Sequence, residues 1–220
     1  MNRLRALLPI ALAALLALAG CATRPINPPI AQADPNAGYR VATRTFLKDR
    51  DTLVVLAFSG GGTRAAAFSY GVLEYLNRTE VTKANGEKAR LLDSVGVITG
   101  VSGGSFTALA YGLYGDKLFS EYEQRFLKRD VQSELIARLL SPANWGSLWF
   151  TDWGRSEMAA DFYDEILFNG ATFADLDRNK RLLIMASATD VSTGARLVFD
   201  QEQFDALCSD VHPVRLARAA

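Results

Sequence analysis

Short apolar runs, glycine-rich breaks and helical patterns alternate along the chain after residue 51. Residues 52–58 (TLVVLAF) and 94–99 (SVGVIT) form nearly continuous apolar runs that include β-branched side chains. Such runs are typical of strands buried on both faces of a parallel sheet. Apolar positions at mostly helical spacing follow over 63–77 and from about 105 to 113, so a strand, a glycine turn and a helix occur twice.

The remainder of the chain continues this alternation. The pattern predicts helices over 117–128, 131–140 and 155–167, and then strands over 181–188 and 196–200. Because strands and helices alternate, we expect an α/β fold: a three-layer sandwich with a mainly parallel central sheet.

The first twenty residues have the layout of a secretory signal. Arg3 and Arg5 precede an uncharged apolar run that is too short to span a bilayer comfortably and that ends directly before Cys21. Residues 18–21 (LAGC) resemble the lipobox of bacterial lipoproteins, in which the cysteine is acylated and the leader is cut off before it. We therefore expect a lipoprotein signal peptide over 1–20 and lipidation of Cys21; an ordinary signal peptide with a chance cysteine is the alternative.

The segment after Cys21 is rich in proline, with four of the seven prolines between residues 22 and 38. Proline fixes φ and lacks an N–H donor, so we expect an acylated cysteine and a flexible tether over 21–50 and a folded domain over 51–220. Acyl chains on Cys21 would anchor the protein to a membrane. Ala22 stands where an inner-membrane retention signal usually has aspartate, so the resemblance favours the outer membrane of a bacterial cell envelope.

Composition and charge narrow the function classes. An apolar content of 49% is ample for a packed core, and 24 basic residues balance 24 acidic ones, so no basic field exists to gather phosphates and we expect no nucleic acid partner. The two cysteines match no zinc site, and we expect neither a metal nor another cofactor. The sequence leaves the oligomeric state open.

Residues 100–104 (GVSGG) match the motif G-x-S-x-G between a predicted strand and a predicted helix. Gly100, Gly103 and Gly104 allow a sharp turn, because a β-carbon at these positions would collide with neighbouring backbone. The turn presents the hydroxyl of Ser102 as a candidate nucleophile, and the next helix directs its positive end toward an oxyanion. A purely structural glycine turn is the alternative.

A second glycine turn, at residues 59–64 (SGGGTR), also lies between a predicted strand and helix. Gly60, Gly61 and Gly62 leave backbone N–H groups uncovered, so these groups can face a negative oxygen. A nucleotide phosphate is disfavoured, because a P-loop needs Lys-Ser or Lys-Thr after the glycines and a dinucleotide fingerprint needs glycine in place of Ala65. An oxyanion hole fits better, because the separate G-x-S-x-G motif already identifies a candidate nucleophile, Ser102.

The pair of motifs, G-G-G-x-R at 60–64 and G-x-S-x-G at 100–104, resembles the patatin-like phospholipase family. Residues 188–194 (ATDVSTG) and 216–220 (LARAA) are similar to further segments of that family, so the resemblance covers about 51–220.

The resemblance implies a serine acyl hydrolase of the phospholipase A or lipid esterase type, acting on a phospholipid or another lipid ester. By the same resemblance, Gly60, Gly61 and Gly62 form the oxyanion hole, Arg64 steadies their loop, and Ser102 attacks the ester carbonyl. The sequence departs from the common family pattern at Ser59 and at Ala65, and neither departure removes a backbone donor.

The base that activates Ser102 is the open question, because a serine hydroxyl is a weak nucleophile by itself. The family uses an aspartate from an Asp-Gly motif, and no Asp-Gly pair occurs in these 220 residues, so we expect this chain to be a fragment or an early-terminated product that is nearly inactive. One alternative is an α/β-hydrolase triad of Ser102, Asp190 or Asp200, and His212. Another is a lipid-binding lipoprotein without turnover.

All three tryptophans lie in residues 145–153 (WGSLWFTDW). Aromatic side chains with a polar atom suit a membrane interface, so a lid or a lipid-contacting loop is one interpretation of this segment. Burial against the sheet is the other.

Overall fold

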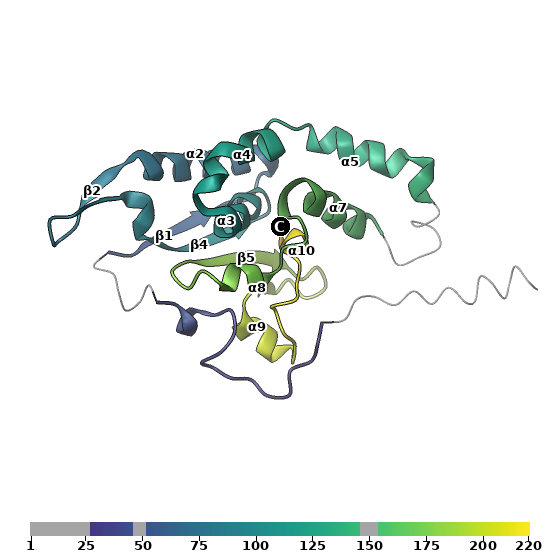
Figure 1. The fold of residues 1–220 in the computed structure, drawn as a ribbon. Coiled ribbons are helices and arrows are strands. Elements are labelled where there is room, and N and C mark those ends of the chain that lie inside the picture. Colours follow the sequence, from purple (N-terminus) through teal and green to yellow (C-terminus); the bar gives the residue numbers. More distant parts are fainter. Residues whose placement is uncertain (1–26, 46–51, 146–153) are drawn as a thin grey trace, which may run out of the picture. The chain divides into compact units, whose positions relative to one another are not determined.

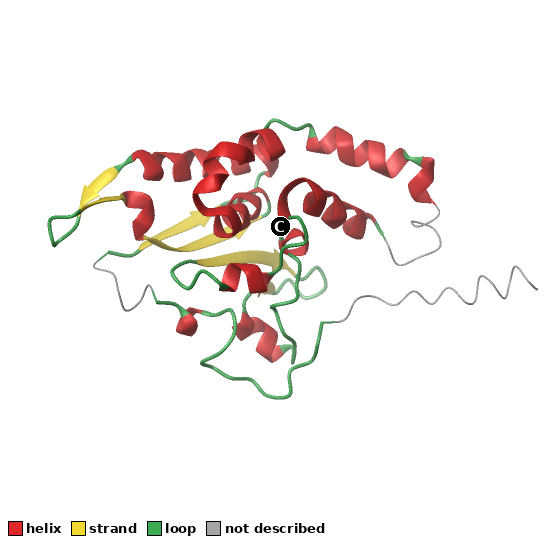
Figure 2. Ribbon diagram, viewed as in Figure 1, coloured by secondary structure: helices red, strands yellow, loops and turns green. Residues whose placement is uncertain are grey.

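The computed structural model describes residues 27–45, 52–145 and 154–220. The described residues form two compact units (Figures 1 and 2). The larger unit contains residues 27–129 and 163–220, and the smaller one contains residues 130–145 and 154–162. Cys21, the expected signal peptide and residues 146–153 of the tryptophan-rich segment lie outside the described residues.

A four-stranded sheet is the centre of the larger unit, with the strand order β1-β4-β5-β6. β1 pairs with β4 and β4 with β5 in parallel, whereas β6 pairs with β5 in antiparallel orientation. The strands are β1 (Val54–Phe58), β4 (Val95–Val101), β5 (Leu183–Thr189) and β6 (Arg196–Val198). β1 and β6 lie within the segments that predicted them, whereas β4 ends two residues and β5 one residue beyond the predicted ends. The expected α/β class with a mainly parallel sheet is confirmed.

Helices make up much of the rest of the described residues. The α-helices are α2 (Gly62–Arg78), α3 (Gly103–Tyr114), α4 (Leu118–Tyr122), α5 (Val131–Leu140), α7 (Arg155–Tyr163), α8 (Phe173–Asp177), α9 (Gln201–Ala206) and α10 (Leu216–Ala219). Short 3₁₀ helices are η1 (Val41–Thr43), η2 (Leu91–Ser94) and η3 (Gly115–Lys117), and π-helical turns are η4 (Glu123–Leu127) and η5 (Asp164–Phe168). No described helix is long and apolar enough to cross a membrane.

Helix α3 is the core helix of the larger unit. It packs against β4, β5 and α2, and its first eight residues, 103–110, are all buried. Figure 1 shows α2 and α3 on one side of the sheet and α9 on the other. Because the same helix contacts two central strands and a second helix, its position fixes the turn that precedes it.

The segment before β1 differs from the expected tether. Tyr39 is completely buried and Arg40 and Arg44 nearly so, and residues 27–45 belong to the larger unit. The Tyr39 hydroxyl donates to the carbonyl oxygen of Ile184 at 2.8 Å and accepts from the Ile184 N–H at 2.8 Å. The side chain thus satisfies both backbone groups of a residue near the start of β5.

Arg44 explains why charge is tolerated in this segment. Its guanidinium lies 4.5 Å from the centre of the Tyr39 ring and donates to Asp177 Oδ1 at 2.6 Å. A buried guanidinium is stable only when it is paired and hydrogen-bonded, and these contacts meet that requirement. The ordered domain therefore begins before residue 51, where proline composition alone indicated a tether.

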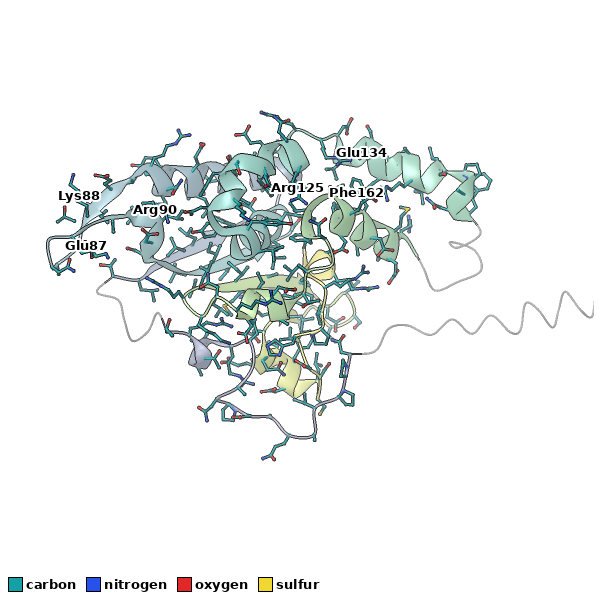
Figure 3. The ribbon with its side chains drawn as sticks, in the orientation of Figure 1. Glu87, Lys88, Arg90, Arg125, Glu134 and Phe162 are labelled. Carbon is teal, nitrogen blue, oxygen red and sulfur yellow. The ribbon has the colours of Figure 1, made fainter. Side chains whose placement is uncertain are left out.

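A small hairpin, not predicted from the sequence, joins α2 to η2. Its strands are β2 (Glu80–Thr82) and β3 (Lys88–Arg90), which pair in antiparallel orientation. Asn85-Gly86 at its tip is the dipeptide that favours tight hairpin turns, and Gly86 has a φ of 82°. The charged side chains of Glu87, Lys88 and Arg90 extend from this hairpin (Figure 3).

The smaller unit contains α5 and most of α7. The Asp130 carboxylate caps α5 by accepting a hydrogen bond from the Ser133 N–H at 3.1 Å. The Arg138 guanidinium lies 4.7 Å from the centre of the Phe162 ring, which is buried. Trp145, the described member of the tryptophan-rich segment, is 52% exposed.

We expect Tyr39→Phe to lower the free energy of unfolding by about 1–3 kcal/mol, because the buried N–H and carbonyl groups of Ile184 lose their partner. Burial raises the pKa of Tyr39, so the hydroxyl that makes both bonds is neutral. Equilibrium unfolding in urea measures the effect. Tyr75→Phe is the matched control, because Tyr75 is 68% exposed. Equal stability of the two variants would contradict the role of Tyr39.

Candidate active site

Ser102 lies at the junction between β4 and α3. Its backbone has φ 50° and ψ −123°, a conformation that residues other than glycine rarely adopt. The residue is exposed, whereas Gly103 and Gly104 beside it are buried. The combination of a strained backbone and an exposed hydroxyl after a buried strand is the geometry of a nucleophile elbow.

The glycines around Ser102 permit close approach of backbone segments. A β-carbon on Gly103 would lie 2.1 Å from the carbonyl oxygen of Gly62, and one on Gly104 would lie 2.7 Å from that of Phe58. A β-carbon on Gly100 would lie 2.7 Å from the α-carbon of Ser105. The turn fits against the end of β1, the glycine loop and the start of α3 only because Gly100, Gly103 and Gly104 have no side chains.

The glycine loop contacts the same turn. A β-carbon on Gly60 would lie 3.4 Å from Cβ of Ser102. Gly61 and Gly62 have φ values of 140° and 64°, which side chains disfavour. The loop therefore lies against the serine and continues directly into α2.

Two helices begin at this place, and neither has a side-chain cap. Gly61 is the N-cap of α2 and Ser102 is the N-cap of α3. The first N–H groups of a helix have no partner within the helix, and the helix dipole adds partial positive charge to them. Such groups are suited to stabilising a negative oxygen beside Ser102.

Arg64 does not make the loop contact that the resemblance implied. It lies in the first turn of α2 and is exposed. Within residues 27–45, 52–145 and 154–220, no hydrogen bond or ion pair holds its guanidinium.

A hollow of about 460 Å³ contains Ser102 at the carboxyl ends of the central strands. Ligands of parallel α/β sheets commonly bind at this edge. The described residues that line it are Val101, Ser102, Ser187, Ala188, Thr189, Arg196, Phe199, Arg218, Ala219 and Ala220. None of these ten is Asp, Glu or His, so their side chains bring a serine hydroxyl and two arginines together without a carboxylate or an imidazole.

His212 lies elsewhere in the larger unit. Its Nε2 is 3.1 Å from Asp177 Oδ2, and its Nδ1 is 3.3 Å from Asp210 Oδ1. It does not line the hollow that contains Ser102. The described structure does not bring the serine and the histidine of the alternative triad together.

The two aspartates of that triad are also engaged elsewhere. Asp190 accepts hydrogen bonds from the N–H and the hydroxyl of Ser192 and from the Thr193 hydroxyl, and these donors lower its pKa to about 2. Asp200 caps α9 by accepting from the Gln203 N–H at 2.8 Å, while burial raises its pKa. Neither carboxylate pairs with His212 in the part of the chain that the structure describes.

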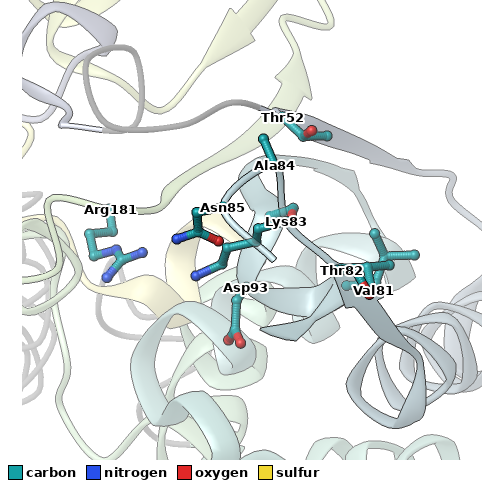
Figure 4. A pocket seen from close by; sticks show the side chains of 10 residues that line it. Thr52, Val81, Thr82, Lys83, Ala84, Asn85, Asp93 and Arg181 are labelled. Atoms are coloured by element: carbon teal, nitrogen blue, oxygen red, sulfur yellow. The ribbon is translucent and has the colours of Figure 1, made fainter. Parts of the chain in front are cut away.

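Another cavity, of about 600 Å³, lies away from the serine (Figure 4). Thr52, Ser94 and Arg181 in its lining each precede a strand of the central sheet. It therefore lies at the amino ends of the parallel strands, opposite the edge where Ser102 is found.

Comparison with known families decides the classification. A family model described as patatin-like phospholipase matches residues 56–220. The chain belongs to the patatin-like phospholipase family. This membership implies lipid acyl hydrolase activity and lipid substrates for the patatin-like domain. No curated protein and no solved structure matches the chain.

The patatin-like domain brings together most of the residues that the sequence singled out. Gly60 lies against Ser102, and Gly103 lies against the glycine loop at Gly62. Gly100 lies against Ser105 in the first turn of α3. Sequence reasoning missed Ser187 and Arg196, which line the same hollow. No local signal marks them, because they reach the site through strand pairing and not through sequence proximity.

We expect Gly103→Ala to destabilise the patatin-like domain by about 1–3 kcal/mol or more, because the new methyl group would overlap the Gly62 carbonyl oxygen. Thermal unfolding measures the loss. Gly71→Ala is the control: it lies within α2 with no atom within 4 Å of an added β-carbon, and alanine favours helix over glycine. A Gly103→Ala protein as stable as Gly71→Ala would contradict the close approach.

Proposed function

We propose that this protein hydrolyses carboxylic esters of lipids, with Ser102 as the nucleophile and the backbone N–H groups of Gly60, Gly61 and Gly62 as the oxyanion hole. The observation that carries the proposal is the strained backbone of Ser102. This residue is exposed directly after β4, and Gly60 lies against its β-carbon. Strain of this kind persists only where surrounding structure imposes it, and it gathers at functional sites.

In the proposed reaction, the Ser102 oxygen attacks the ester carbonyl carbon while its proton passes to a base. The carbonyl oxygen becomes an oxyanion, and the N–H groups of the glycine loop and of the first turn of α3 stabilise it. Collapse of the tetrahedral intermediate breaks the bond to the alcohol, which takes up the proton. Water then attacks the acylated serine by the same steps and releases the fatty acid.

The base in this proposal is an aspartate of the kind that the family resemblance implies, in a dyad with Ser102. No Asp-Gly pair occurs among the 220 residues, and no acidic or histidine side chain is among the described residues lining the hollow. That observation also favours a second candidate, a lipid-binding protein of the same family without turnover. Activity of the natural full-length protein distinguishes the two.

The proposal includes attachment to the bacterial cell envelope through acylated Cys21. The support is the sequence of residues 18–21 (LAGC) after a charged and apolar leader. Attachment of this kind would hold the hydrolase beside its lipid substrate, and more than one acyl chain is needed for a stable anchor. The outer membrane is the favoured location because Ala22 follows the cysteine.

We expect Ser102→Ala to reduce ester hydrolysis by the natural full-length protein on the order of a thousandfold or more, because the attacking oxygen is lost. A nitrophenyl ester and a fluorophosphonate probe measure turnover and serine labelling. Ser120→Ala is the control, because Ser120 is an exposed residue of α4. Unchanged hydrolysis or labelling in Ser102→Ala would refute the nucleophile.

His212→Ala separates the dyad from the alternative triad. We expect it to retain hydrolysis, because the described hollow does not include His212. Its unfolding midpoint must be recorded alongside, because the ring contacts Asp177 and Asp210. A folded His212→Ala protein that has lost turnover and still binds substrate would favour the triad.

We expect metabolic labelling with palmitate to mark the wild-type protein and not Cys21→Ser, because the thiol of Cys21 is the proposed attachment atom. Cys208→Ser, which removes the other cysteine of the chain, should be labelled like the wild type. Labelling of Cys21→Ser at the wild-type level would show that the anchor lies elsewhere or is absent.

A further inference from the structure

Arg196 brings a cation to the hollow that contains Ser102. Its guanidinium donates from both Nε and Nη2 to the hydroxyl oxygen of Ser187, at 3.3 and 2.9 Å. The side chain therefore reaches from β6 back over β5, and the hydroxyl holds the planar group in one orientation.

The strand register places the residue that holds this cation beside the Ser102 turn. Ser187 pairs with Val101, the residue directly before Ser102. Neighbouring strands lie roughly 4.8 Å apart, so the backbone of Ser187, whose hydroxyl holds the guanidinium, lies one strand from the peptide that leads into Ser102.

The charge of Arg196 is not neutralised by the described protein. Several other arginines pair with carboxylates, as Arg40 does with Asp205 and Arg44 with Asp177. In residues 27–45, 52–145 and 154–220, Arg196 has only the neutral Ser187 hydroxyl as partner.

The nearest acidic residue along β5 is turned away. Thr189 pairs with Arg196, and Asp190 follows it directly. The Asp190 carboxylate instead accepts three hydrogen bonds within its own turn, from Ser192 and Thr193. The guanidinium of Arg196 is left available for an anion that enters from outside.

Guanidinium groups bind phosphate oxygens well, because the planar fork of N–H donors matches the geometry of the anion. In a glycerophospholipid, the phosphodiester is separated from the acyl ester carbonyl by only a few bonds of the glycerol. A cation that lines the same hollow as Ser102 is therefore suitably placed for the phosphate of a lipid whose ester lies at Ser102.

We propose that Arg196, held by Ser187, binds the phosphate of a phospholipid head group and so selects phospholipids over neutral glycerides. The inference rests on the proposed hydrolase function, because it deepens the substrate class of the same site. Arg196 acts on substrate binding and orientation and takes no part in proton transfer.

The test measures binding, so it does not depend on turnover. A short-chain, monomeric dialkyl ether analogue of phosphatidylglycerol is titrated into the full-length protein, beside the matching dialkyl ether glycerol. Ether bonds cannot be hydrolysed by this reaction. We expect the wild type to bind the phospholipid analogue roughly tenfold more tightly than the neutral analogue, and Arg196→Gln to lose that preference.

Two further variants refine the test. Arg196→Lys keeps the charge but not the planar fork, so we expect part of the preference to remain. Arg178→Gln is the matched control, because it removes an arginine that is 81% exposed and pairs with Asp175, and it should bind like the wild type. A wild-type preference retained in Arg196→Gln would overturn the inference.

Inorganic phosphate in place of the lipid identifies the source of the anion. If phosphate alone binds Arg196 as tightly as the phospholipid analogue does, the group is a free-anion site and the head-group assignment fails. Hydrolysis and fluorophosphonate labelling are measured on the same preparations. If the phospholipid analogue binds in an Arg196-dependent way but neither hydrolysis nor labelling occurs, the hydrolase function is refuted and the head-group site is supported. If hydrolysis occurs but Arg196→Gln does not change binding, the hydrolase function is supported and the head-group site is refuted.

Discussion

Direct backbone contact between the start of α3, the end of β1 and the glycine loop is the constraint on which the site depends. The contact exists because Gly103 and Gly104 have no β-carbons, which would otherwise lie 2.1 and 2.7 Å from carbonyl oxygens of Gly62 and Phe58. It brings the uncapped amino ends of α2 and α3 to the same serine. The backbone of Ser102 is strained because both segments are fixed, α3 by its burial and β4 by pairing on both of its edges.

The electrostatic character of the site follows from the same arrangement. Partial positive charge from two helix ends and the guanidinium of Arg196 meet at the carboxyl edge of the sheet, and no acidic side chain is among the described residues of the lining. The formal net charge of the whole chain is zero, so the local excess of positive charge arises because the acidic side chains lie elsewhere in the fold. Asp177 and Asp205 are paired with Arg44 and Arg40 away from the serine.

The segment before β1 shows how a side chain can complete a sheet. The antiparallel pairing of β6 with β5 covers residues 187–189 and does not reach Ile184. The Tyr39 hydroxyl makes both hydrogen bonds with the backbone of Ile184, and Arg44 and Asp177 pack and pair beside it. The proline content of residues 22–38 led us to expect a tether through residue 50, but Tyr39 and the paired Arg44 are buried in the larger unit.

The sequence by itself determined the features that are local. Buried apolar runs with β-branched residues predicted β1 and β4, and the pattern of the later segments predicted β5 and β6. The two glycine motifs predicted the turns at Gly60 and Ser102, because strand burial and tight turns depend on neighbouring residues. Only the tertiary structure decided which distant groups meet. Tyr39 and Ile184 are 145 residues apart, and Arg196 reaches the serine through the register of β6 on β5 and of β5 on β4. Strand order and register come from packing of the whole sheet, and a shift of one residue would turn every side chain to the opposite face, so no local pattern along the chain encodes these pairings.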